Sequence, residues 1–181
     1  KPSGLLDQMA SSVGSVVAID FKDVKKPVVR KVEFDLAKHG YALCIVDSGA
    51  DHADLTHEYA AIPTDMKAVA AYFGKEFLRD VDENEFFANL KNVRAALNND
   101  RAILRAIHFF GDNQKAQEEA AALEADDFDK FLKLNKESGR SSYMYLQNIY
   151  AASMPESQAV SLALALCDEI LGDRGSYRVH G

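Results

Sequence analysis

The stretch YALCIV at residues 41–46 predicts a β-strand that is buried on both faces. It is short and continuously apolar, and it lies between Gly40 and the turn-forming residues 47–49. Such a run, with turn residues at both ends, is typical of a strand that is covered on its two sides. We therefore expect Cys44 to be a buried free thiol, and Cys167 likewise because it lies in a helix-like run. Two unpaired cysteines favour a reducing, cytoplasmic setting.

Two further strands are predicted before this stretch, at residues 15–20 and 28–34. A polar, lysine-rich turn separates them. In the second strand, Val28, Val32 and Phe34 share one face and charged residues occupy the other. This alternation is typical of a half-exposed strand.

The chain turns helical after residue 55. Five helices are expected, at residues 56–73, 82–97, 101–123, 126–136 and 153–171. Gly74 ends the first of them, and Pro63 is expected to kink it. Ser153 and Glu156 form a capping box, which predicts that the last helix begins there.

A final strand is predicted over residues 177–179, and it must return to the early sheet to be buried. The expected fold is therefore α+β, with an antiparallel or mixed sheet and helices packed on one face. We expect residues 1–181 to form a single domain, because a chain of this length can bury one sizeable core.

Charge and hydropathy exclude several classes of function. The net charge of −7 argues against a nucleic-acid-binding surface, which needs a basic stripe. The sequence contains no apolar run of membrane-spanning length and no signal peptide. The acidic run at residues 118–127 is expected to be a solvated helix face. We expect His39 to be exposed and His108 to be a satisfied core histidine.

Residues 51–58 are rich in acids and histidines, which raises the question of a metal site. His52 and His57 are five positions apart, so they would not share a helix face, and no known ligand spacing matches. We expect a polar loop that caps the next helix through Thr56, and no protein-borne metal site.

The segment GLLDQ at residues 4–8 is a candidate site. Gly4 would let the backbone approach a ligand closely, and Asp7 could accept a proton from a hydroxyl group. An acid in the first turn of an ordinary helix is the alternative. The chain opens on Lys1 rather than methionine and closes on Gly181, so we expect a piece of a longer protein.

The chain contains six short motifs in a characteristic order and spacing: GLLDQ at 4–8, AID at 18–20, DS at 47–48, EY at 58–59, RAIH at 105–108 and GSYR at 175–178. Together they resemble the galactokinase branch of the GHMP sugar kinases. The resemblance extends over essentially the whole chain and corresponds to the second half of such a kinase.

The resemblance implies a GHMP-kinase C-terminal, ferredoxin-like domain. It also implies ATP-dependent phosphorylation of galactose at its 1-hydroxyl, giving galactose 1-phosphate. Asp7 would be the catalytic carboxylate that accepts the hydroxyl proton and contacts the sugar, with Gly4 and Tyr59 as further sugar contacts. Gly181 would support the loop on the nucleotide side.

The same resemblance places the phosphate-binding loop and the Mg²⁺ ligands in the preceding half of the same chain. No glycine-rich phosphate loop occurs within the 181 residues. We therefore expect the partners to be a sugar, ATP and that N-terminal half, and this chain to be inactive alone.

One position departs from the family pattern. Many galactokinases place an arginine or lysine near the position of Asp51, where a cation would lower the pKa of the catalytic carboxylate and neutralise phosphate charge. Either His52 substitutes, the loop shifts, or the sugar differs. An N-acetylhexosamine or uronic-acid kinase, a non-catalytic sugar sensor, and a chance match in a generic α+β domain therefore stay open.

Overall fold

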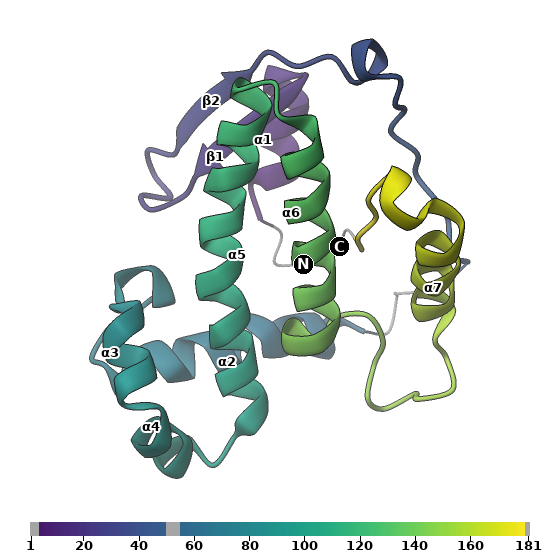
Figure 1. Cartoon of the computed structure of the whole chain (residues 1–181). Coiled ribbons are helices and arrows are strands. Elements are labelled where there is room, and N and C mark those ends of the chain that lie inside the picture. The colour runs from purple at the N-terminus through teal and green to yellow at the C-terminus, as the bar shows by residue number, and fades with distance from the viewer. Residues whose placement is uncertain (1–3, 50–54, 180–181) are drawn as a thin grey trace.

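Two long helices form the centre of the molecule in a computed structural model that describes residues 4–49 and 55–179 (Figure 1). α5 (Asp100–Glu124) and α6 (Phe128–Ser141) pack side by side and are joined by a short turn. The side chains of Asn99 and Asp127 accept backbone N–H groups at their N-termini, as helix caps do. α6 continues into a π-helical turn, η3 (Ser142–Leu146).

A β-hairpin covers one end of this helix pair. β1 (Val16–Asp20) and β2 (Val28–Val32) are antiparallel, with Val16 opposite Val32 and Asp20 opposite Val28. α1 (Leu6–Val13) precedes the hairpin and packs on β1. Val32 is buried with Leu123 and Phe128, so this end of the molecule has its own small core.

The opposite end holds the larger core. It is built by α2 (Thr56–Tyr72), the 3-10 turn η2 (Leu78–Asp80), α3 (Glu83–Ala88), α4 (Leu90–Leu97) and the first half of α5. Its fully enclosed side chains include Val69, Phe86, Val93 and Ala106.

The predictions for α2 and α5 are confirmed to within a residue or two, and Pro63 lies inside α2. The single helix predicted at 82–97 is wrong. It breaks at Asn89, whose side-chain amide donates to the carbonyl of Glu85 (2.9 Å). The capping box prediction is also wrong, because α7 (Ala159–Leu171) begins only after Gln158.

The predicted strand at residues 41–46 is wrong. The segment follows the 3-10 turn η1 (Leu36–His39) as an irregular chain, and the exposed fractions of Leu43, Ile45 and Val46 are 81%, 95% and 64%. Cys44 is exposed rather than buried, and Cys167 is partly buried. The physical reason is the lack of a neighbour: within the described residues, β1 and β2 are the whole sheet.

Residues 175–179 also differ from their prediction, since they form no strand. They follow the 3-10 turn η4 (Gly172–Arg174) and lie against α6, where the Ser176 hydroxyl donates to Asn135 Oδ1 (2.9 Å). A Cβ atom on Gly139 would lie 2.9 Å from the carbonyl oxygen of Tyr177, so only glycine allows this approach. The fold is therefore α+β, as expected, but mostly helical with a two-stranded antiparallel sheet.

The helices of the described chain are also informative about membranes. None of them combines the length and apolarity that crossing a bilayer requires.

Candidate functional site

Asp7 lies in the first turn of α1 and is exposed. Met9 and Ala10 are partly buried where α1 packs on β1, which leaves Asp7 on the solvent side. Gly4 is exposed as well, and a Cβ atom built on it would meet nothing within 4 Å. The start of the chain therefore presents both an accessible carboxylate and accessible backbone.

Tyr59 lies in the first turn of α2 and is 45% exposed. α1 and α2 lie at opposite ends of the α5/α6 pair (Figure 1). Asp7 and Tyr59 therefore come from two separate elements of the fold. Asp51, His52 and Gly181 lie outside the described residues.

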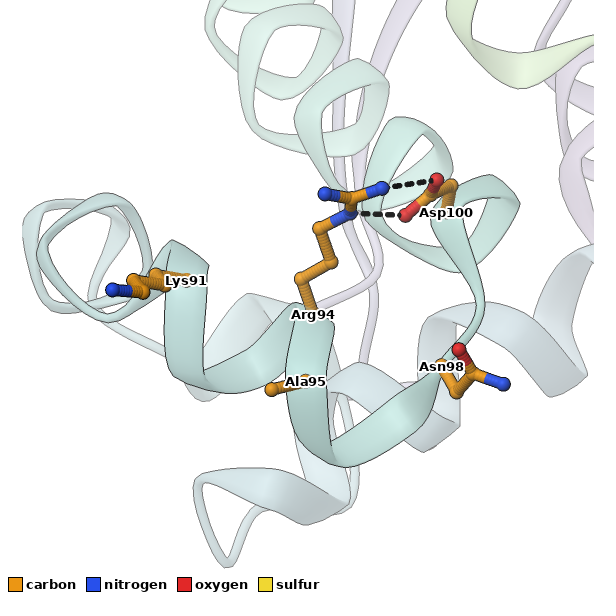
Figure 2. A pocket seen from close by; sticks show the side chains of 5 residues that line it. All are labelled: Lys91, Arg94, Ala95, Asn98 and Asp100. Atoms are coloured by element: carbon orange, nitrogen blue, oxygen red, sulfur yellow. Dashed lines mark hydrogen bonds and ion pairs between the residues drawn. The ribbon is translucent and has the colours of Figure 1, made fainter.

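A shallow pocket of about 410 Å³ lies between α4 and the start of α5 (Figure 2). Arg94 donates to both carboxylate oxygens of Asp100, at 2.6 and 2.9 Å, while Lys91 points away from this pair. The pair raises the pKa of Arg94 and lowers that of Asp100. The pocket contains no predicted site residue, and Arg94 and Asp100 pair with each other within it as an exposed ion pair between α4 and α5.

A second, more apolar pocket of about 270 Å³ lies between the hairpin turn and α2. Phe21, Met66 and Phe109 line it, and Lys67 Nζ lies 5.5 Å from the ring centroid of Phe77. Sequence patterns do not reveal this pocket, because its residues come from four separate segments of the chain.

A buried ion pair ties α2 to α5. Asp65 Oδ2 accepts from Arg105 (2.7 Å) and from Arg101 (2.9 Å), and Arg105 also donates to the carbonyl of Leu146 (3.1 Å). The side chains of Asp65 and Arg105 are 7% and 2% exposed. Arg105, which begins one of the galactokinase-like motifs, therefore joins α5 to α2 and η3.

A second polar cluster lies between α5, α6 and the C-terminal segment. His108 Nδ1 lies 2.9 Å from Ser141 Oγ, Ser138 donates to Asp112 (2.5 Å), and Arg178 donates to Ser138 (2.8 Å). His108 is buried, which confirms the prediction of a satisfied core histidine, and burial lowers its pKa. His39 is instead partly buried and stacks on Phe34, contrary to expectation.

Glu119 belongs to this cluster, although the sequence placed it on a solvated acidic face. Its Oε1 atom is buried and has no hydrogen-bond partner within the described chain. Burial raises the pKa of Glu119 to about 7, while the charges of Arg178 and Lys115 act in the opposite direction. An acid whose pKa lies near 7 inside a packed interface is a feature that sequence patterning does not reveal.

Comparison with known proteins gives a consistent result. No family model matches the chain. A galactokinase from Actinobacillus pleuropneumoniae serotype 5b is 27% identical over 181 residues, which is 98% of this chain. The human galactokinase is 31% identical over 169 residues, 91% of the chain. This chain is homologous to the galactokinases.

The homology confirms the resemblance that the motifs indicated. A third galactokinase, from Mycobacterium tuberculosis strain H37Rv, is 33% identical over 130 residues. The chain spans less than half the length of these relatives: 43%, 40% and 34% of the bacterial, human and mycobacterial proteins respectively.

Proposed function

We propose that residues 1–181 are the C-terminal domain of a galactokinase-like sugar kinase. The homology over 98% of the chain carries this proposal. The reaction we propose is phosphoryl transfer from ATP to the 1-hydroxyl of galactose, giving galactose 1-phosphate and ADP.

Asp7 is the proposed catalytic base, with Gly4 and Tyr59 as sugar contacts. Asp7 is exposed at the end of α1, where a sugar can reach it. As the carboxylate takes the proton, the 1-hydroxyl oxygen forms its bond to the γ-phosphorus and the bond to the β-phosphate oxygen breaks. General bases of this kind contribute roughly 10²–10⁴-fold to a rate.

The remaining parts of the site are proposed to come from the rest of a longer chain. The described residues hold no group of three or more histidines, cysteines or acids that could bind a metal. From the family resemblance, we assign the Mg²⁺ ligands and the ATP phosphate loop to the preceding half. Gly181 would support the nucleotide side from this chain.

An alternative substrate is favoured by one observation. Many galactokinases have an arginine or lysine near the position of Asp51 in the sequence, and an acid at this position carries the opposite charge. An N-acetylhexosamine or uronic acid would then replace galactose in the same reaction.

The test uses the full-length protein, with ATP consumption measured against galactose, N-acetylgalactosamine and galacturonic acid. We expect turnover of galactose and a loss of about 10²–10⁴-fold in kcat for Asp7→Asn. Asp23→Asn, an acid in the hairpin turn, is the matched control. Full activity of Asp7→Asn would overturn the role of Asp7, and no turnover of any sugar would overturn the kinase assignment.

A further inference from the structure

The pocket of about 270 Å³ between the hairpin turn and α2 combines aromatic walls with positive charge. Its residues come from the hairpin turn, α2, η2 and the middle of α5. The hairpin turn and η2 lie on the same side of α5 (Figure 1), and the Arg79 guanidinium of η2 donates to Asp20 Oδ2 at the end of β1 (3.2 Å). The pocket therefore lies where the hairpin end of the molecule meets the larger core.

The walls of this pocket are mainly aromatic. Phe21, Phe77 and Phe109 line it from three different elements, together with Met66. Met66 and Phe109 also pack against the larger core, so this wall is firmly supported. Phe77, by contrast, is 44% exposed. Phenylalanine rings prefer offset stacking or edge-to-face contact with another ring, so these walls suit a flat aromatic group.

The charge of the lining runs against the charge of the chain. The pocket is lined by three cationic side chains, Lys22, Lys67 and Arg79, and by one acid, Asp80. The whole chain has a net charge of −7. Small-molecule sites are typically apolar hollows with a few polar groups that fix the orientation of the ligand. Here those groups are mostly cations, which favours an anion.

Two of the three cations are available to a ligand. Arg79 is engaged by Asp20, whose other carboxylate oxygen accepts the backbone N–H of Lys22 (2.8 Å). Within the described part of the chain, the ammonium groups of Lys22 and Lys67 have no carboxylate at ion-pair distance. Lys67 Nζ instead lies 5.5 Å from the ring centroid of Phe77, which keeps it beside an aromatic wall.

We infer that this pocket binds a small aromatic carboxylate. Its ring lies against the phenylalanines, and its carboxylate accepts hydrogen bonds from Lys22 and Lys67. The volume of about 270 Å³ is slightly below the range of about 300–1,000 Å³ typical of ligand pockets, so one or two fused rings fit and a nucleotide does not. A phosphate would favour a bidentate arginine, and Arg79 already binds Asp20.

The inference does not rest on the proposed kinase reaction. None of the residues that line the pocket is Asp7, Gly4 or Tyr59. Binding of an aromatic carboxylate and turnover of a sugar are measured separately, so one can fail while the other holds.

The first experiment measures binding of 2-naphthoate to the full-length protein by equilibrium dialysis. The comparison compound is 2-acetylnaphthalene, which has the same rings and no charge. We expect 2-naphthoate to bind about 10-fold more tightly, because charge-assisted hydrogen bonds form only with the carboxylate. Equal affinities, or no saturable binding of 2-naphthoate, would overturn the inference.

A pair of lysine variants tests the role of the cations. Lys67→Glu replaces one exposed helical residue by another of similar helix propensity, and we expect it to weaken 2-naphthoate binding by at least about 10-fold. Lys133→Glu, at an exposed position of α6 outside the pocket, changes the net charge equally and should leave the affinity unchanged. Equal affinities of Lys67→Glu and Lys133→Glu would contradict the site.

Methionine methyl resonances locate the ligand without altering the pocket. In methyl-labelled full-length protein, the Met66 signal, assigned with Met66→Leu, should shift on addition of 2-naphthoate. The signal of Met144, which is 61% exposed in η3, should not. A Met66 signal that does not respond would overturn the inference. A Met66 signal that shifts with protein concentration alone would assign the pocket to a second copy and overturn it as well.

Discussion

The core around α2 and α5 and the uncovered surfaces at 41–46 and α7 are built from the same residue types, yet they differ in burial. Phe86 and Val93 are fully enclosed, whereas Ile45 and Leu166 face solvent. The difference lies in the neighbours: α2, α3 and α4 supply partners to α5 from within the chain, whereas Leu43, Ile45 and Leu166 belong to neither hydrophobic core of the described residues. Apolar composition therefore predicts a need for burial, while topology decides whether this chain can meet it.

The largest test of this comparison breaks the buried pair that holds the core together. Asp65→Asn should lower the free energy of unfolding by about 3–5 kcal/mol, because it leaves the Arg105 guanidinium buried without its counter-charge. Urea denaturation of the 181-residue chain measures the change.

The matched control is Asp100→Asn, which removes the exposed partner of Arg94. We expect no measurable change, because exposed ion pairs contribute little. If Asp65→Asn and Asp100→Asn lower the free energy of unfolding by similar amounts, then the buried pair of Asp65 and Arg105 stabilises the fold no more than the exposed pair does.

The second test concerns Glu119. Its folded-state pKa of about 7 lies above its ordinary value of 4.5, so the folded protein holds the extra proton between these two pH values. The free energy of unfolding therefore falls as the pH rises through this window, and the stabilisation is lost above pKa 7. Glu119→Gln should remove this dependence and raise stability at about pH 8 by roughly 2 kcal/mol, discounted for partial exposure.

His108 acts in the opposite direction. Its folded-state pKa is lowered, so its contribution is present above its ordinary value of 6.5 and is lost as the pH falls. The other charged groups that face this cluster are unchanged in Glu119→Gln; they are Asp112, Lys115 and Arg178. Glu118→Gln, on the same helix, is the control for Glu119→Gln. If the free energy of unfolding of Glu119→Gln keeps the same dependence on pH, Glu119 is not the group that causes it.

The third test compares Gly111 in α5 with Gly139 in α6. Alanine at an unconstrained helix position stabilises by up to about 1 kcal/mol relative to glycine. Gly111→Ala should show this gain, since its Cβ would meet only the flexible end of Lys115 (3.3 Å). Gly139→Ala should instead destabilise by roughly 1 kcal/mol, because its Cβ would meet backbone. Thermal unfolding of both variants measures whether stability rises or falls. If both variants are stabilised, residues 175–179 move away from Gly139 without cost.

The smallest expected effect is on the uncovered surface itself. Leu166→Gln should change the unfolding free energy of the 181-residue chain by less than about 0.5 kcal/mol, because its side chain already faces solvent. Denaturation of this variant beside Val93→Ala, which opens a cavity in the core, sets the scale. A loss of comparable size in Leu166→Gln would place α7 within the core.

Helical periodicity predicted α2 and α5 well, because their apolar spacing, and for α2 the stop at Gly74, agree with the packing that forms. It failed at Asn89, where α3 ends and the Asn89 side-chain amide donates to the carbonyl of Glu85. It also failed at Ser153, where a capping pattern is not followed by a helix. Local pattern cannot report whether a strand has a neighbour, which is why the segment at 41–46 was misplaced.

The candidate site was predictable only through its motif. GLLDQ at residues 4–8 gave Asp7 and Gly4, and the structure leaves both accessible. The burial of Glu119 and the pairing of Asp65 with Arg105 were not predictable, since each depends on helices brought together from distant parts of the chain. The roles of Asp7, Gly4, Tyr59 and Gly181 remain predictions.

The missing methyl group at Gly139 also bears on the order in which the chain assembles. The α5/α6 pair is made of contacts that are close in sequence, and such contacts form early. Residues 175–179 are synthesised after α5 and α6, so the surface that receives them leaves the ribosome first. We expect residues 175–179 to dock late, as a short extended segment added to the folded helix pair. Because Gly139 has no side chain, the Tyr177 carbonyl can then approach α6.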